Sequence, residues 1–297
     1  MPVAKQKSTF EEFLRKYSVV VTAILMILVG EVITGGTFLT CSNLLNVGER
    51  AAAIGIISLG QMLVILTGGM DLSVSGIVAL GYCLTILLLK VNNIPVPVTM
   101  VLVIGGTTLC GAINGFLVSR TKVPPFMLTL GTYMIFQSLA LVFSKAENMH
   151  YNAVVDYMQG HWHLTGMVGR LFPTFMWVLI SIIVIFMLAY SRLGKNIYQT
   201  GGKELAAKMS GINTQRIKFF VYTFTGLLCG LAALLLEFRL TFSNATSTSV
   251  FQISSIAAVI IGGTSIKGGE GNVYGTFIGA FIMASLDNLM NLVGIQV

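Results

Sequence analysis

The sequence predicts an all-α integral membrane protein, a polytopic bundle of transmembrane helices in which some helices are discontinuous. Of its 297 residues, 55% are hydrophobic and 10% are charged, and the mean hydropathy is +0.85. Polar side chains are therefore too few to cover a water-soluble protein of this length. Long stretches such as 175–189 are apolar on every face, which is typical of membrane helices, whereas strands of a membrane barrel alternate apolar and polar residues.

Apolar stretches close to the roughly 20 residues that cross a bilayer recur along most of the chain. We expect about nine membrane segments, some of them short or interrupted by glycine, as in the half-helices that line transporter cavities. In chain order they cover Ser18–Leu39, Ala51–Thr67, Gly76–Lys90, Val96–Val118, Phe126–Phe143, Phe172–Tyr190, Ile217–Phe238, Ile253–Thr264 and Val273–Val293.

The basic residues predict the orientation of these segments. With a cytoplasmic N-terminus and one crossing per segment, thirteen of the 18 Lys and Arg fall on the inside and five on the outside, as the positive-inside rule requires. The formal net charge of +7 is then a topology signal and does not indicate a nucleic-acid-binding surface. The chain is expected to form one transmembrane domain, 1–297, with a cytoplasmic tail at 1–17, an extracytoplasmic loop at 144–171 and a cytoplasmic loop at 191–216.

The sequence indicates neither a metal site nor a disulfide framework. The extracytoplasmic loop holds the three histidines, but His161 and His163 lack a third ligand at convincing spacing. The four cysteines lie in or beside apolar spans without paired spacing, so we expect them to be packing residues.

The cytoplasmic loop contains a short predicted helix. Gly201 and Gly202 precede the helix formers of 203–210, and Gly211 follows them, a pattern typical of a brief helix that ends on its own glycine. Such a helix between two membrane spans fits either an ordinary connector or a segment that docks into the groove of a soluble partner.

A second polar interruption follows the span that ends at Thr67. It places Asp71 between a glycine pair and Ser73. Asp71 is expected to cap the helix that follows, by accepting backbone N–H groups at its N-terminus. The alternative is that this break lines a translocation path, where Asp71 and its neighbours would meet substrate hydroxyls.

Four blocks of residues, in order and spread over most of the chain from about Asn43 onward, resemble membrane permeases of ATP-driven (ABC) importers of the ribose, galactose and xylose type. The blocks are Gly68–Val74; Gly111–Gly115 continuing through Arg120, Pro124–Phe126 and Thr129–Thr132; Gly194–Tyr198 continuing through Gly201, Gly202, Ala206, Ala207 and Ser210–Asn213; and Ala257–Ser265 followed by Gly268, Gly269, Gly271, Gly275 and Thr276.

The resemblance implies a multi-pass permease of the bacterial inner membrane that works as a pair, with a second copy or a homologous permease. An extracytoplasmic sugar-binding protein would lie on one side and ATP-binding subunits on the other. The short cytoplasmic helix would contact the ATPase, which gives a coupling role to Gly201, Gly202, Glu204, Ala206, Ala207, Ser210 and Gly211. The candidate substrate pathway would comprise Asp71, Ser73, Asn114, Thr129 and Thr132. Family members usually continue past Asn291–Gly294 with one further span, whereas this sequence ends at Val297, so its C-terminus is expected outside.

The chain itself is not expected to be an enzyme or to hold a cofactor. A phosphate-binding G-x-x-x-x-G-K-[ST] loop is absent, since Gly269 stands where the lysine should follow Gly263–Gly268. ATP would therefore be hydrolysed on a separate subunit. The main alternative is an ion-coupled secondary transporter, for which Glu31, Glu237 and Asp287 are the acids in or near apolar spans. An ABC permease for nucleosides or another small polar solute, and a non-transporting scaffold, are further alternatives. Glu237 is also expected to neutralise Arg239 in part.

Overall fold

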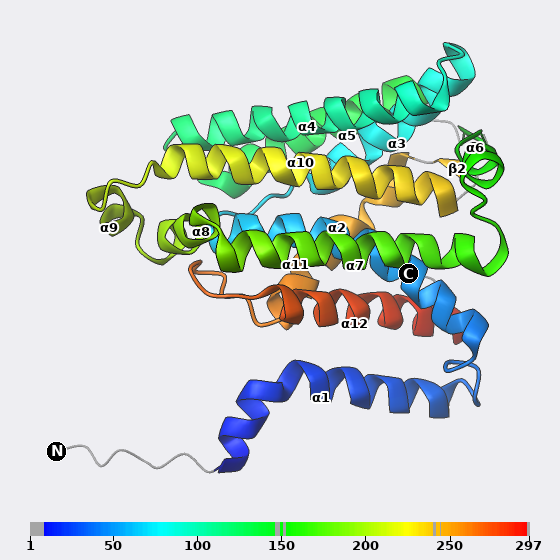
Figure 1. The fold of residues 1–297 in the computed structure, drawn as a ribbon, viewed down its shortest axis with the longest axis horizontal. Helices are drawn as coiled ribbons and strands as arrows, with labels where there is room; N and C mark the ends of the chain where they lie inside the picture. Colours follow the sequence, from blue (N-terminus) through cyan, green and yellow to red (C-terminus); the bar gives the residue numbers. More distant parts are fainter. Residues whose placement is uncertain (1–8, 146–148, 151–152, 240–241, 244, 296–297) are drawn as a thin grey trace.

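A computed structural model describes residues 9–145, 149–150, 153–239, 242–243 and 245–295 of the chain. The long helices run side by side along one axis, with the α9 end and the α6 end at opposite extremes of the bundle (Figure 1). Residues 1–8 of the predicted tail, and part of the predicted 144–171 loop, lie outside the described residues. The helices and strands are α1 (Thr9–Ile33), α2 (Cys41–Leu66), α3 (Val74–Ile86), the π-helix η1 (Leu87–Val91), α4 (Val96–Arg120), α5 (Pro125–Ser144), β1 (Met149–His150), α6 (Ala153–Trp162), α7 (Gly166–Tyr190), α8 (Arg192–Gly202), α9 (Glu204–Met209), α10 (Thr214–Arg239), β2 (Phe242–Ser243), the 3-10 helix η2 (Ala245–Thr248), α11 (Val250–Ile261) and α12 (Val273–Leu292).

The all-helical transmembrane class is confirmed, apart from one short antiparallel pair of β1 with β2. Within the described part of the chain, six helices are long and apolar enough to cross a membrane: α2, α4, α5, α7, α10 and α12. Shorter apolar helices occupy Tyr17–Ile33, Val74–Lys90 and Thr246–Ile261. The nine predicted segments thus all correspond to helices, while nine full crossings stay a prediction. At 1.5 Å per residue, α3 and α11 rise about 20 Å each, less than the hydrocarbon thickness.

Helix α2 lies at the centre of the bundle. It packs against α7, α10, α11 and α12, and almost all of its side chains from Ala51 onward are buried. The helix begins ten residues before the predicted span, because its first turns carry polar residues that meet partners on other helices. The Glu49 carboxylate accepts a hydrogen bond from Nε of Arg170 at 2.9 Å and lies 3.6 Å from Nε of Arg239.

This arrangement corrects the expected neutralisation of Arg239 by Glu237. Arg239 pairs with Glu49, while Glu237 is buried on the same helix, two positions earlier, with Oε1 lacking a hydrogen-bond partner among the described residues. Residues two apart on a helix point in different directions, so they do not face one another.

A reciprocal amide pair joins α2 to α12. Nδ2 of Asn43 donates to Oδ1 of Asn288 at 3.0 Å, and Nδ2 of Asn288 donates back to Oδ1 of Asn43 at 2.9 Å. Both side chains are buried. Each amide therefore satisfies the other in a place that water does not reach.

Replacing Asn288 by leucine is expected to destabilise the protein by about 1–3 kcal/mol, because Asn43 would keep a buried oxygen without a donor. Thermal unfolding of the detergent-solubilised protein measures this loss. Asn291→Ala serves as the control, since Asn291 makes an exposed bond within its own helix. Equal melting temperatures for the two variants would contradict the assignment.

Candidate functional site

Helix α9 is the short helix expected in the cytoplasmic loop. It ends on Gly211, which has a φ of +82°. The N–H of Gly211 donates to the carbonyl of Lys208 at 3.0 Å, and the N–H of Ile212 donates to the carbonyl of Ala207 at 3.0 Å. These two bonds form a Schellman motif, in which a left-handed glycine satisfies the last helical carbonyls. The prediction of a brief helix that ends on its own glycine is confirmed.

The glycine pair before α9 is helical, which the sequence analysis missed. Gly201 and Gly202 form the last turn of α8, and the chain leaves the helix at Lys203. Gly201 packs directly against the carbonyl oxygen of Leu66 at the end of α2, and a Cβ at Gly201 would overlap that oxygen. The same carbonyl accepts a hydrogen bond from the N–H of Gly269 at 3.0 Å. We call this meeting of Leu66, Gly201 and Gly269 the glycine junction.

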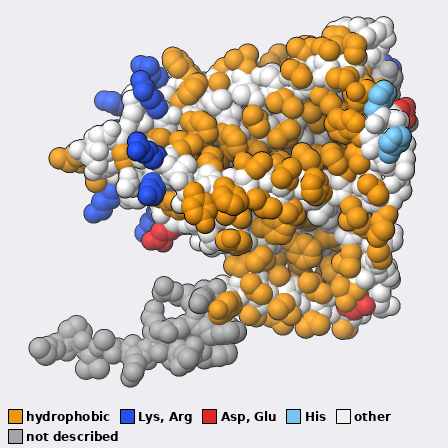
Figure 2. Space-filling model, viewed as in Figure 1, with side chains coloured by type: hydrophobic (Ala, Val, Ile, Leu, Met, Phe, Trp, Pro, Cys, Tyr) orange, Lys and Arg blue, Asp and Glu red, His pale blue; other side chains and the backbone are white. Residues whose placement is uncertain are grey.

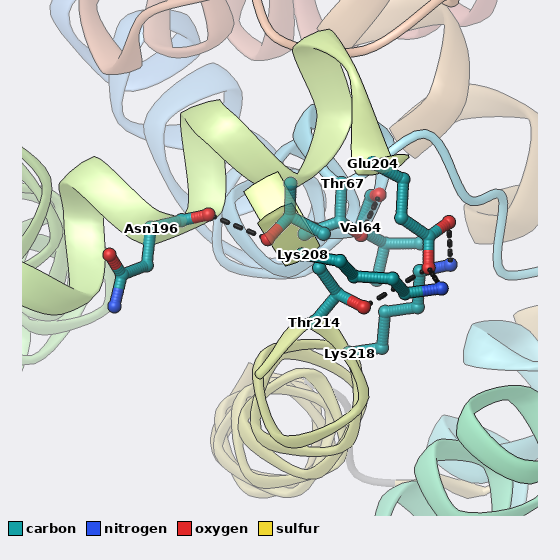
Figure 3. Close-up of polar contacts among 8 residues, drawn as sticks. Val64, Thr67, Asn196, Glu204, Lys208, Thr214 and Lys218 are labelled. Carbon is teal, nitrogen blue, oxygen red and sulfur yellow. Dashed lines mark hydrogen bonds and ion pairs between the residues drawn. The ribbon is translucent and has the colours of Figure 1, made fainter. Parts of the chain in front are cut away.

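Glu204, the first residue of α9, ties that helix to α10. Its carboxylate receives Nζ of Lys218 at 2.7 Å, Nζ of Lys208 at 2.9 Å and the hydroxyl of Thr214 at 3.1 Å. Figure 3 shows the lysines and Thr214 gathered around this carboxylate. Partial burial acts to raise its pKa, but the hydrogen bonds from Lys218, Lys208 and Thr214 outweigh that effect and lower the pKa from 4.5 to about 2.

The pH dependence of this contact follows from the lowered pKa. The ionised carboxylate stabilises the folded state at pH values above 4.5, and that contribution is lost as the pH falls towards 2. The glutamate side chain is 38% exposed, so solvent screening limits the contribution to at most about 1 kcal/mol. The melting temperatures of wild type and Glu204→Gln should differ by a constant amount from pH 8 to about 5 and converge below the ordinary Glu pKa. A difference that changed between pH 6 and 8 would contradict this assignment.

The outer face of α9 is apolar and unprotected. Leu205 is 73% exposed and Met209 is 83% exposed, and their spacing of four residues places them on one side of the helix. Ala207 is buried towards the bundle, while Ala206 and Ser210 are exposed. Lys and Arg side chains gather at this end of the molecule (Figure 2). These features suit a contact with a separate protein.

The predicted pathway residues meet at the break between α2 and α3. Oδ1 of Asp71 accepts the Ser73 N–H at 2.8 Å and the Ser73 hydroxyl at 2.6 Å. Nδ2 of Asn114 donates to that hydroxyl at 2.6 Å, and Oγ1 of Thr129 accepts the N–H of Leu72 at 3.0 Å. The break is therefore held by side chains from α4 and α5. Asp71, Ser73 and Asn114 form one hydrogen-bonded network, and Thr129 binds the backbone of the same break.

Thr132 lies one turn beyond Thr129 on α5 and bonds to its carbonyl instead of joining the network directly. All five predicted residues are buried. Asp71 does not cap α3 as expected: the N-cap position is Ser73, and Asp71 binds that residue's own N–H and hydroxyl. The reason is that α3 begins only at Val74, so the Asp71 carboxylate binds Ser73 ahead of the helix and not an N–H of its first turn.

Two residues that sequence reasoning missed complete this region. Gln61 on α2 donates its amide to the carbonyl of Asp71 at 2.7 Å. Tyr222 on α10 is buried, and its hydroxyl would lie 2.7 Å from a Cβ placed on Gly69. Both residues stand inside apolar spans, where a polar group was the available signal.

The described residues contain no group of three His, Cys, Asp or Glu that could hold a metal ion. His161 and His163 are exposed, and Nδ1 of His161 lies 3.2 Å from the backbone oxygen of Tyr157 within α6. The structure thus presents two features, the exposed helix α9 and the buried polar break between α2 and α3, and α10 contacts both α9 and α3.

Sequence comparison places this chain among transport permeases. Residues 43–296 match the family model described as "Branched-chain amino acid transport system / permease component". The chain is 34% identical to the ribose import permease protein of Escherichia coli K12 over 87% of this chain and 81% of the relative. It is 34% identical to the ribose import permease protein of Bacillus subtilis 168 over 92% of this chain and 84% of the relative. It is 31% identical to the D-allose transport system permease protein of Escherichia coli K12 over 98% of this chain and 89% of the relative. No solved structure shows significant similarity.

Proposed function

The chain belongs to this family of transport-system permease components, and we propose that it is the membrane-spanning permease of an ATP-driven importer that carries a monosaccharide. The observation that supports the sugar class is the set of relatives, which are named for ribose import and D-allose transport. As a permease subunit in a multi-pass inner-membrane location, the chain would leave ATP hydrolysis to separate ATP-binding subunits.

We assign α9 to the contact with those ATP-binding subunits. Leu205 and Met209 would enter a groove on the partner, in the manner of an amphipathic helix whose anchors repeat every four residues. Glu204 would hold α9 against α10 through Lys218, so that force on α9 reaches the bundle. Gly201, Gly202, Ala206, Ala207, Ser210 and Gly211 would shape this segment without themselves supplying the contact energy.

The α9 end is proposed to face the cytoplasm, with the N-terminus on the same side. The basic residues of α8, α9 and the start of α10 lie there, as does Arg120 at the end of α4, close to Arg216 around one cavity. Concentrated positive charge at one end of the bundle is what positive-inside orientation requires. The opposite end, with α6 and the Glu49 ion pairs, would receive an extracytoplasmic sugar-binding protein.

The five predicted residues Asp71, Ser73, Asn114, Thr129 and Thr132 are proposed to shape the solute path. These side chains are buried within one chain, so they would meet solute hydroxyls only when α3 and α5 move apart. A second copy of the permease, or a homologous one, would supply the facing wall of the pathway.

An ion-coupled secondary transporter is the second candidate, because Glu237 is a buried acid with an unpartnered oxygen among the described residues, and such groups serve as proton or cation sites in transporters. The ATP-driven assignment is preferred because an ion-coupled carrier would not explain why α9 exposes an apolar face. An ABC permease for nucleosides or another small polar solute differs from the main proposal in substrate alone.

The proposal is tested by isolating the complex and its solute together. We expect the tagged permease to co-purify with ATP-binding subunits, and the binding protein encoded beside it to bind D-ribose or a related monosaccharide by calorimetry. Unlabelled ribose, allose or a nucleoside would then compete for uptake in the order of their affinities for the binding protein. Co-purification with ATP-binding subunits but binding of a nucleoside alone would overturn the sugar assignment and keep the permease assignment.

A further inference from the structure

The hydroxyl of Tyr222 is a buried hydrogen-bond donor that lacks an acceptor among the described residues. The side chain is fully buried on α10, and its hydroxyl has no hydrogen-bond partner within the described part of the chain. It points at the break between α2 and α3, where a Cβ on Gly69 would lie 2.7 Å away. The glycine thus leaves the room that the hydroxyl occupies.

The same break contains a buried hydrogen-bond acceptor, Oδ2 of Asp71, that lacks a donor among the described residues. Oδ1 of Asp71 accepts both groups of Ser73, whereas its Oδ2 is buried and unpartnered among the described residues. The Tyr222 hydroxyl lies against Gly69, two residues before Asp71 in the same break. Buried polar groups are almost always paired, and an unpaired one is costly. The hydroxyl and the carboxylate oxygen, both unpartnered among the described residues, would satisfy one another if a movement brought them within hydrogen-bond distance.

Helix α10 connects the pair of Tyr222 and Asp71 to α9. Lys218 in its first turns binds Glu204 of α9 at 2.7 Å, and Tyr222 stands four residues later on the same face of α10. A shift or rotation of α9 would therefore move Tyr222 as well, because Lys218 and Tyr222 belong to the same helix, α10. Energetic coupling between distant sites needs an element with two discrete arrangements that each site can bias, and α10 is the helix in contact with both sites.

We propose that Tyr222 is a positioning residue that carries the movement of α9 into the break, by donating its hydroxyl to Oδ2 of Asp71 in one of two conformations of the permease. This hydrogen bond is not formed in the conformation described here. This inference rests on the proposed function, in which α9 contacts the ATP-binding subunits. It adds the part of the bundle through which that contact reaches the candidate pathway.

Tyr222→Phe removes the hydroxyl and keeps the ring. In proteoliposomes that hold the full complex with its binding protein, we expect the number of D-ribose molecules taken up per ATP hydrolysed to fall about tenfold, the factor that corresponds to one hydrogen bond to a charged group. The melting temperature should not fall and should rise slightly, because phenylalanine removes a buried hydroxyl that has no partner among the described residues in this conformation. Tyr190→Phe is the matched control, because that tyrosine is 80% exposed at the end of α7.

A double-mutant cycle separates coupling from independent damage. Asp71→Asn and the double variant Asp71→Asn with Tyr222→Phe should transport equally poorly, because the hydroxyl acts through the carboxylate. If the two losses multiply, or if Tyr222→Phe behaves as Tyr190→Phe does, the inference is overturned. If the Asp71→Asn complex fails to assemble, the comparison of Tyr222→Phe with Tyr190→Phe still tests whether transport needs the Tyr222 hydroxyl. A wild-type complex that takes up no ribose with ATP would instead overturn the proposed function.

Discussion

Replacing Gly201 by alanine is expected to destabilise the protein and abolish transport, whereas the same replacement at Gly202 is expected to be tolerated. The added methyl at Gly201 would overlap the Leu66 carbonyl oxygen and lie 2.8 Å from the backbone nitrogen of Gly269. These atoms are backbone, so they cannot rotate away. Overpacking of this kind costs about 1–3 kcal/mol or more, and it would separate the three segments of the glycine junction.

Gly202 provides the control within the same helix turn. A Cβ there would meet no atom within 4 Å, and alanine is a better helix former than glycine. Melting temperature and ribose uptake of the two variants, measured side by side, test the junction. Equal behaviour of Gly201→Ala and Gly202→Ala would show that the close approach of α8 to α2 is not needed.

Charged substitutions on the exposed face of α9 are expected to abolish recruitment of the ATP-binding subunits. Leu205→Asp with Met209→Asp would place two carboxylates where the proposed groove of the partner is apolar. Truncation of an anchor residue at an interface costs about 2 kcal/mol or more, which corresponds to roughly a 30-fold loss of affinity. Both side chains are exposed in the isolated chain, so the fold should be unaffected.

Co-purification of the ATP-binding subunits with the permease measures this effect, with the melting temperature of the permease as the check on folding. Leu205→Met with Met209→Leu keeps the apolar face and should retain the subunits. If the aspartate variant retains them as well, α9 is not the contact helix.

The sequence predicted the helices well because their signal is local. Each predicted span corresponds to a helix, and α9 was found from its composition and from Gly211. The helix ends were less accurate for the same reason: α2 extends through Glu49 and Arg50, charged residues that ended the apolar run but are accommodated by contacts with other helices.

Contacts between residues far apart in the sequence could not be predicted from local composition in this way. Asn43 and Asn288 are 245 positions apart, and nothing near either residue predicts the other. The sequence predicts that Gly201 precedes the short helix, but not that it ends another helix and packs, for lack of a side chain, against the Leu66 carbonyl. Tyr222 is visible in the sequence as a polar group in an apolar span, but its position against Gly69 is not.

The energy source of transport tests the central claim most directly. Purified permease is reconstituted in liposomes with its ATP-binding subunits, ATP is enclosed on the α9 side, and the binding protein with D-ribose is supplied on the other. The account predicts ribose accumulation that requires ATP, the ATP-binding subunits and the binding protein, and that persists without any ion gradient. Accumulation driven by a proton or sodium gradient in liposomes that contain the permease alone would contradict it.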